Sequence, residues 1–359
     1  MKVNKNLFKW GWLSILFIFS YLLIATAATH ISRYMIPKPY MGGISSQQEA
    51  FFQQKDDINL LFLGSSGFGS TINPIILDSE MDRLGCPIRS FNLSPDGLNS
   101  IETRYVLEQI IKSRPKKLST IILDLPPIHY GFKQKDALRT RFFNTWSNFV
   151  PFVTDIWNLP RFRKKRALIL LDFIISFAYE RSGVGLLHST FISPPEGYPP
   201  AEIIVRQRGY GGDLEKHIHS AEKSARLSRE VAKLKKQIDS WKASYAEMNR
   251  VGHLARLKPV IDKVESYGFE VAVLLAPTMT NYSYAEPLKQ IFTEKMPRTP
   301  MWHYNDFVKW PDFMDGANLR NITHMNPRGA VMFSKILAKD LCQSFKSGEL
   351  RSITPPLSL

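Results

Sequence analysis

Cysteine is scarce in this chain, and its scarcity excludes a disulfide-rich scaffold. Only Cys86 and Cys342 occur among 359 residues. Small secreted domains that depend on disulfides carry several cysteine pairs. The two cysteines could pair in an oxidising compartment, but one pair does not make a disulfide framework.

Charged residues are missing from one long stretch near the N-terminus. Residues 10–32 contain no Asp, Glu, Lys or Arg, and a bilayer-spanning helix needs about 20 mostly apolar residues. Lys2, Lys5 and Lys9 precede the stretch, which predicts a cytoplasmic N-terminus. We therefore expect a single-pass anchor in an inner or plasma membrane, with the bulk of the chain extracytoplasmic, either periplasmic or extracellular.

The same stretch has a second interpretation. Ala25-Thr26-Ala27 resembles the cleavage site of a removable signal peptide. The apolar run is longer than a typical signal core, and Trp10, Trp12 and Tyr21 suit a retained helix. These features favour the uncleaved anchor.

Acidic residues are outnumbered by basic ones. The chain has 32 Asp and Glu against 47 Lys and Arg, which gives a formal net charge of +15. Nucleic acid is a poor partner for an exported domain, so anionic lipid headgroups or anionic envelope polymers are the expected partners. Scattered surface lysines that only maintain solubility would give the same net charge.

Short apolar runs alternate with helical patterns along much of the remaining chain. Strands are expected at 58–63, 88–93, 118–125 and 269–276, and helices at 74–84, at 254–267 and from Asn326-Pro327 onward. This alternation predicts an α/β fold with a parallel sheet covered by helices. The expected organisation is a cytoplasmic tip and anchor at 1–32, a linker at 33–57, an α/β domain at 58–125 and 254–345, a mainly helical insertion at 126–253, and a flexible tail at 346–359.

The first part of the insertion combines basic and apolar residues. The cluster R-F-R-K-K-R at 161–166 precedes an apolar run at 167–178. The run contains Asp172 and is too short to span a bilayer. It could lie in a membrane interface, where basic flanks suit anionic headgroups, or form the core of the insertion.

The second part of the insertion is a charged helix predicted at 214–251. Apolar residues recur along it at alternating spacings of four and three, namely Leu227, Val231, Leu234, Ile238, Trp241, Tyr245 and Met248. Such a stripe forms either an intermolecular coiled coil or a hairpin with the next helix, 254–267. The hairpin is favoured.

A serine follows the first strand. Residues 63–74 read L-G-S-S-G-F-G-S-T-I-N-P, which matches neither nucleotide-binding glycine fingerprint nor the α/β-hydrolase elbow. What remains is a serine at the carboxyl end of a strand, beside a helix N-terminus that can stabilise an oxyanion. His324 precedes the final helix and can act as its base, while a residue three positions earlier can orient the ring.

These blocks together resemble the SGNH (GDSL-like) hydrolase superfamily. Gly64-Ser65-Ser66 is similar to its first block, with Ser66 at the nucleophile position. F-N-L-S-P-D-G-L-N-S at 91–100 is similar to the second, with Gly97 at the oxyanion-hole position, and Asn321-Ile-Thr-His324 to the fifth. The resemblance implies a three-layer domain, with Ser66, His324 and Asn321 as catalytic residues and the backbone N–H groups of Ser66 and Gly97 as oxyanion donors.

Two positions depart from that pattern. Ile128 occupies about the position of the third-block Asn, so one oxyanion donor is missing, which typically costs about 3 kcal/mol of transition-state stabilisation. Asn321 replaces the triad Asp, and it can orient His324 but supplies no charge. Asp315 or Asp312 could approach the histidine instead.

The anchor, the Gly-Ser-Ser variant and the insertion resemble envelope proteins that work with membrane O-acyltransferases, such as alginate O-acetylation and D-alanyl-teichoic-acid transfer proteins. The resemblance implies a serine esterase or acyltransferase acting on an envelope glycan or lipid, with a membrane-bound acyltransferase as partner and no cofactor or metal. The alternative is a catalytically inert scaffold that binds an envelope polymer or an acyltransferase. Simpler roles also fit: Ser66 can cap a turn, His324 can be structural, and Gly97 can serve a turn.

Overall fold

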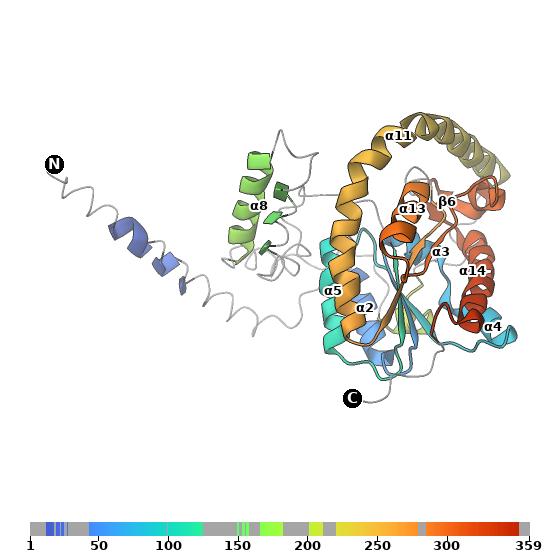
Figure 1. Cartoon of the computed structure of the whole chain (residues 1–359), viewed down its shortest axis with the longest axis horizontal. Coiled ribbons are helices and arrows are strands. Elements are labelled where there is room, and N and C mark those ends of the chain that lie inside the picture. The colour runs from blue at the N-terminus through green and yellow to red at the C-terminus, as the bar shows by residue number, and fades with distance from the viewer. Residues whose placement is uncertain are drawn as a thin grey trace. The chain divides into compact units, whose positions relative to one another are not determined.

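The computed structural model describes the chain in segments (Figure 1). The described residues are 43–98, 100–124, 166–181, 201–210, 220–278 and 285–351, with shorter pieces at 12–17, 19–21, 23–24, 27, 149–150, 153–154 and 156–157. The chain divides into two compact units. One comprises 1–42 and 130–197, and the other comprises 43–129 and 198–359.

The larger unit is an α/β domain. Its elements in chain order are α2 (Gly43–Gln54), β1 (Leu60–Leu63), α3 (Ser66–Thr71), α4 (Pro74–Arg83), β2 (Ser90–Leu93), α5 (Ser100–Lys112), β3 (Thr120–Asp124), α10 (Ala201–Arg206), α11 (Ala221–Ser266), β4 (Glu270–Leu275), α13 (Ala285–Lys295), β5 (Met301–His303), η2 (Pro311–Met314), η3 (Gly316–Asn318), β6 (Leu319–Asn321), β7 (His324–Met325) and α14 (Pro327–Ser347). Five strands form a parallel sheet in the order β2-β1-β3-β4-β5. The predicted α/β class and parallel sheet are confirmed.

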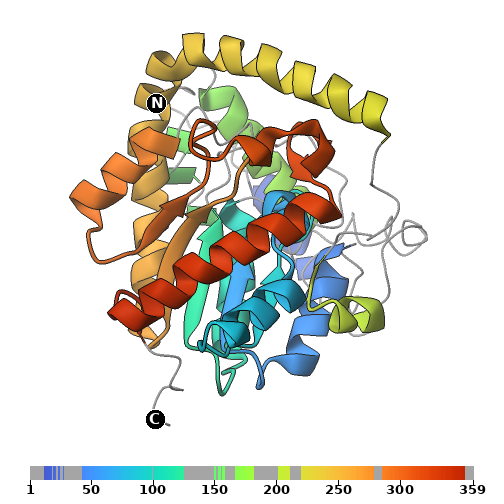
Figure 2. The same ribbon diagram turned by 90° about the vertical axis from the view of Figure 1, so that its right-hand side faces the viewer.

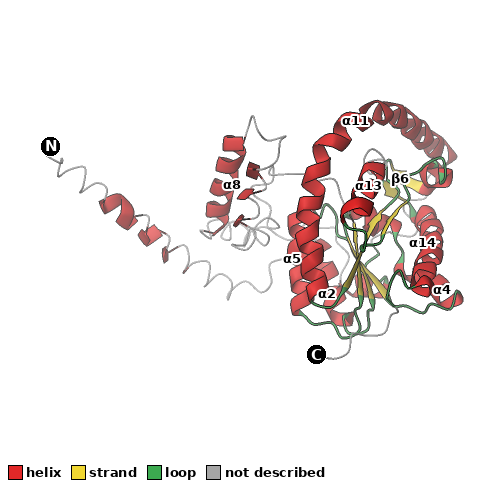
Figure 3. Ribbon diagram, viewed as in Figure 1, coloured by secondary structure: helices red, strands yellow, loops and turns green. Residues whose placement is uncertain are grey.

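Helices cover both faces of the sheet (Figure 3). Every residue of β1, β2 and β3 is buried, as expected for strands with helices on both sides. On one face, Phe62 packs on Phe68 of α3, in the same core as Phe333 of α14. On the other, Phe91 packs on Phe51 of α2. Figure 2 shows α14 running across its face of the sheet.

The structure corrects the predicted linker and tail. Residues 43–54, expected within a linker, form α2, and Phe51 on this helix is fully buried. At the other end, Leu350 is fully buried and the N–H of Arg351 donates to the Glu270 carboxylate at 3.0 Å, so the first part of the expected tail is packed. Both segments add apolar surface to the domain core.

The end of the predicted insertion also belongs to the α/β domain. Helix α10 packs against α2, where Gln54 Nε2 donates to Val205 O at 3.2 Å. The Asn92 N–H donates to Arg208 O at 2.9 Å, and Arg208 forms an ion pair with the buried Asp78 of α4. Residues 201–210 therefore close the outer edge of β2.

The predicted helical hairpin is wrong, because α11 is one continuous helix of 46 residues. Its first turns carry Leu227 and Val231, which are buried in the same core as Phe313. The stripe residues from Ile238 to Met248 have side chains outside the described set. The described part of the stripe thus packs within the chain, against the α/β core.

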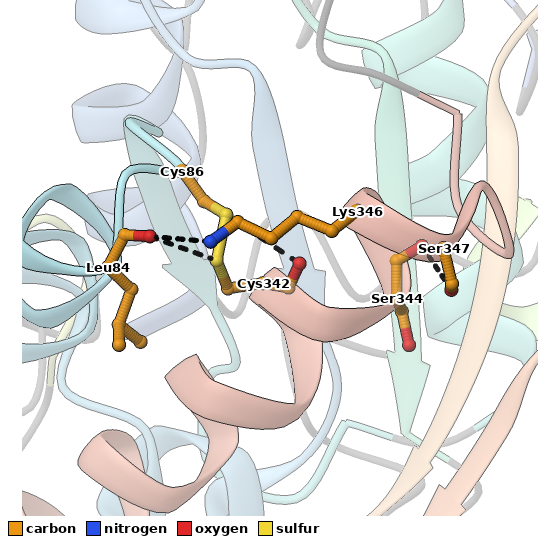
Figure 4. Close-up of a disulfide and its surroundings, with 6 residues drawn as sticks. All are labelled: Leu84, Cys86, Cys342, Ser344, Lys346 and Ser347. Atoms are coloured by element: carbon orange, nitrogen blue, oxygen red, sulfur yellow. Dashed lines mark hydrogen bonds between the residues drawn. A yellow bond between two sulfur atoms is a disulfide. The ribbon is translucent and has the colours of Figure 1, made fainter.

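A disulfide joins the region before β2 to the last helix. Cys86 and Cys342 are bonded across a sequence separation of 256 residues (Figure 4). Beside the bond, Lys346 Nζ donates to Leu84 O at 2.9 Å. The two contacts tie the C-terminal half of α14 to the end of α4.

The smaller unit contains α8 (Arg166–Arg181). The predicted anchor at 1–32 also falls in this unit and is described only in part. Of the helices within the described residues, none is long and apolar enough to cross a membrane.

Candidate active site

The turn that carries Ser66 is held by the end of β3. β1 ends at Leu63, and α3 begins at Ser66. Between them, a Cβ atom on Gly64 would lie 2.4 Å from Asp124 Cβ, so no larger residue fits. Both the N–H and the hydroxyl of Ser65 donate to Asp124 Oδ2, at 3.2 and 2.9 Å. Asp124 therefore fixes the backbone immediately before Ser66.

The other end of α3 is held by β2. Buried Asn92 donates from Nδ2 to two carbonyl oxygens, Phe68 O at 2.9 Å and Ile72 O at 2.8 Å. Gly69 approaches the neighbouring loop so closely that a Cβ atom would lie 2.6 Å from Ser94 O. These contacts seat the short helix, and with it Ser66, at the carboxyl edge of the sheet.

His324 lies at the turn of a small hairpin formed by β6 and β7. Asn326 directly follows this hairpin and caps α14, the helix expected from Asn326-Pro327 onward, by accepting from the Gly329 N–H at 3.0 Å. The same side chain donates to Ala317 O at 2.8 Å and Leu319 O at 3.3 Å. Asn326 thus joins the hairpin to the start of the helix and holds His324 in position.

Ser66, His324 and Asn321 form one hydrogen-bonded chain. Ser66 Oγ lies 2.8 Å from His324 Nε2, and Asn321 Oδ1 lies 3.0 Å from His324 Nδ1. The residues are brought together from the first and last thirds of the sequence. This is the arrangement that a serine nucleophile, its base and an orienting group require.

The surrounding contacts fix the tautomer of His324. The Thr323 N–H, which can only donate, lies 2.9 Å from the Asn321 side-chain oxygen. That atom is therefore an acceptor, so Nδ1 of His324 must carry the proton that it receives. Nε2 is then unprotonated and accepts the hydrogen bond from the Ser66 hydroxyl. The histidine is oriented as a base.

The environment of His324 favours its neutral form. Burial lowers the pKa of His324 below 6.5, and the charge of Arg320 lowers this pKa further. The negative charge of Asp96 acts in the opposite direction and raises the His324 pKa. A base with a depressed pKa stays unprotonated at mildly acidic pH.

The remaining predicted residues have different outcomes. Gly97 lies in the turn after β2 with a φ of 64°, a conformation that favours glycine, and its part in an oxyanion hole stays a prediction. Ile128 is outside the described residues. Asp315 does not serve as the histidine's carboxylate, because its Oδ1 accepts from the Ala317 N–H at 3.0 Å and lies 3.5 Å from Ser228 Oγ. Asp312 contributes a backbone oxygen to Asn318.

Four residues that contribute to the site were not identified from the sequence. Thr323 Oγ1 lies 2.8 Å from His324 Nδ1 and 2.9 Å from Asn321 Oδ1. Asp124 holds the serine turn, while Arg320 and Asp96 set the charge around the histidine. Arg320 directly precedes the Asn321-to-His324 motif and Thr323 lies within it, so their proximity was available as a signal. Asp124 lies within the strand expected at 118–125, and the sequence carries no sign of its contact with Ser65.

Within the described part of the chain, no group of three or more His, Cys, Asp or Glu is placed to hold a metal ion. No model of a known protein family matches the chain, and no curated protein sequence matches it. The interpretation of the chain's function therefore depends on the geometry of the candidate active site.

Proposed function

We propose that this protein is an SGNH-like extracytoplasmic serine esterase or acyltransferase that acts on a cell-envelope glycan or lipid. The observation that carries the proposal is the chain from Ser66 Oγ to His324 Nε2 and from His324 Nδ1 to Asn321 Oδ1. Such a chain serves to activate a serine hydroxyl for attack on an acyl group.

The proposed chemistry has two halves. Ser66 Oγ bonds to the acyl carbon while its proton passes to His324 Nε2, and the leaving alcohol takes that proton as the ester bond breaks. The acyl group then rests on Ser66. Water, for an esterase, or an acceptor hydroxyl, for an acyltransferase, gives a proton to His324 and attacks the acyl carbon, and Ser66 recovers its proton. No cofactor is required for either half.

The oxyanion that forms in each half of the proposed reaction needs hydrogen-bond donors at the carboxyl edge of the sheet. The first N–H groups of a helix have no intrahelical acceptor, which makes the Ser66 N–H a suitable donor at the start of α3. Gly97 follows the neighbouring strand β2. Its N–H is the second proposed donor.

The proposed location is supported by the disulfide. Bonds such as Cys86–Cys342 form and persist in oxidising compartments, including the periplasm and the extracellular space. The described positions near the N-terminus also expose large apolar side chains, with Phe17 73% and Ile24 67% exposed. Such surface suits the proposed membrane attachment and a membrane-bound acyltransferase as partner.

A second function is favoured by one specific observation. The two hydrogen-bond partners of His324 Nδ1 are an amide oxygen and a hydroxyl, and neither can stabilise the imidazolium with a full charge. A catalytically inert scaffold, binding an envelope polymer or an acyltransferase, would tolerate this substitution. The two functions make opposite predictions about Ser66.

A fluorophosphonate probe, which bonds covalently to activated serines, distinguishes them. We expect the purified full-length protein to be labelled at Ser66, and the label to disappear in Ser66→Ala. Ser266→Ala is the control, because Ser266 is an exposed residue at the end of α11 whose hydroxyl donates to Lys263 O, and this variant should label normally. Absence of labelling in the folded wild type, with and without membranes from its host, would favour the scaffold.

A further inference from the structure

One face of α8 is apolar and exposed. Leu168 is 68% exposed, Leu171 54%, Ile174 42% and Ile175 54%. Their spacings of three and four residues place these four side chains on one side of the helix. Ala167 and Ala178 extend the same face in both directions. We call these six residues the outer face of α8.

The opposite side of the helix already packs inside its own unit. The Phe149 ring lies 5.5 Å from that of Phe173 and 4.5 Å from that of Phe177, measured between centroids. Phe173 and Phe177 are each 4% exposed. The outer face is therefore additional apolar surface, beyond what the small core of this unit uses.

Basic residues directly precede α8 in the sequence, and an aromatic ring lies beside its first residue, Arg166. The sequence R-F-R-K-K-R runs directly into the start of α8 at Arg166. The Arg166 guanidinium lies 5.2 Å from the centre of the Trp157 ring, and Trp157 is 58% exposed. Lysine and arginine beside exposed tryptophan and aliphatic residues are the composition of a helix that lies in a membrane interface.

The length of α8 sets its orientation in a membrane. The helix has 16 residues and contains Asp172, so it is too short and too polar to cross a bilayer. The same compact unit includes residues 1–42, and these expose further apolar side chains, such as Phe19 and Leu23. One unit thus presents two uncovered apolar segments, and a lipid phase can cover both.

We propose that α8 lies flat in the headgroup region of an anionic membrane, with its outer face against the acyl chains and Arg161–Arg166 binding acidic headgroups. This second attachment would hold the smaller unit at the membrane surface. It is independent of the chemistry at Ser66, because it uses no residue of the site.

The test places a fluorophore on the outer face. The only two native cysteines are disulfide-bonded, so Leu171→Cys can be labelled selectively in the full chain. The labelled protein is reconstituted into lipid-only nanodiscs of phosphatidylglycerol and phosphatidylcholine, with and without brominated acyl chains. Val308→Cys is the control, because Val308 is 84% exposed and lies in the α/β unit.

We expect bromine to quench the label at position 171 and leave the label at position 308 unchanged. In phosphatidylcholine discs, or after Lys164→Ser with Lys165→Ser, quenching at position 171 should be largely lost, because the acidic headgroups or their partners are missing. The matched control is Lys116→Ser with Lys117→Ser, an exposed lysine pair in the α/β unit, which should change nothing.

Two results would overturn the proposal. One is a label at position 171 that stays as accessible to aqueous iodide as the label at position 308 in anionic discs. The other is protection of position 171 in native membranes but not in lipid-only discs, which would mean that a protein covers the outer face.

Discussion

Asn321 Oδ1 lies 3.0 Å from His324 Nδ1, so an amide stands where a catalytic triad normally has a carboxylate. The oxygen also accepts from the N–H and the hydroxyl of Thr323, both at 2.9 Å. Three donors thus converge on one neutral oxygen. The site is already organised for a carboxylate that the sequence does not supply.

Asn321→Asp should raise the pKa of His324 and increase the rate of ester hydrolysis, or leave it unchanged. The new charge would stabilise the imidazolium, and Thr323 could keep its hydrogen bonds. Asn321→Ala should lower the rate, because the ring loses its orienting acceptor. NMR titration of the histidine and initial rates on an activated ester measure both quantities. A lower rate for Asn321→Asp in a protein of unchanged structure would contradict this view.

Ser66 and His324 should act as a unit. Ser66→Ala or His324→Ala alone should each reduce the serine-dependent kcat by about 10³-fold or more, and the double variant should lose little beyond either one. The physical reason is that each residue has no catalytic use without the other across their 2.8 Å contact. The double-mutant cycle is measured on the same ester. Additive losses in the cycle would show two independent roles.

Activity should persist below pH 6.5. Burial and Arg320 depress the His324 pKa, and the neutral imidazole is the active form, so the acid limb of kcat/KM should have its midpoint below 6.5. Arg320→Gln removes a positive neighbour and should shift that midpoint upward. Asp96→Asn removes a negative neighbour and should shift it downward. Shifts in the same direction for both variants would mean that their charges do not act on His324.

The buried Asp78 should make stability depend on pH in a specific window. Burial is the largest influence and raises the pKa of Asp78 to about 6, despite hydrogen bonds from Ser90 and the charge of Arg208. An acid with a raised pKa in the folded state binds its proton more tightly there than in the unfolded state. Its contribution to the free energy of unfolding is therefore full below pH 3.8 and is lost as the pH rises through 6. The change is roughly 3 kcal/mol at most.

Urea unfolding at pH 4 and pH 7 tests this window. The fall in the free energy of unfolding between the two should be smaller in Asp78→Asn than in the wild type. Asp262→Asn is the control, because this exposed carboxylate pairs only at the surface with Lys258, and the wild-type fall should remain. Equal falls in all three proteins would contradict the assignment to Asp78.

Local patterns in the sequence were enough to find four of the five strands of the sheet and the hydrogen-bonded residues Ser66, His324 and Asn321 of the site. Apolar runs such as 58–63 and 269–276 are visible because strands buried on both faces leave almost no polar positions. Ser66 follows the first of these runs, and Asn326 and Pro327 mark the start of α14. Each signal lies within about ten residues, so no long-range information was needed.

The elements that were missed depend on contacts between distant residues. Helix α2 reads as polar, since it contains four Gln after Ser45, and only its packing against Phe91 reveals its role. Arg208 joins the domain through Asp78, 130 positions earlier. The hairpin prediction failed because the stripe beginning at Leu227 packs on the α/β core, which allows α11 to continue unbroken. Contacts between residues so far apart in the sequence leave no pattern in the residues around either of them.

The Cys86–Cys342 bond should contribute a large share of the stability. The two cysteines are 256 residues apart in the sequence. In the chain-entropy account, closing a loop of that size lowers the entropy of the unfolded chain and raises the free energy of unfolding by up to about 5 kcal/mol. Reductant, or Cys86→Ser with Cys342→Ser, should therefore lower the urea midpoint without changing the parallel sheet. Because the chain has no other cysteine, any effect of reductant reports on this bond alone, and the double variant should be insensitive to it. Thiol titration must show two free groups after reduction. A wild type that is fully reduced by this criterion yet unfolds at the same urea concentration would show that the bond does not stabilise the fold.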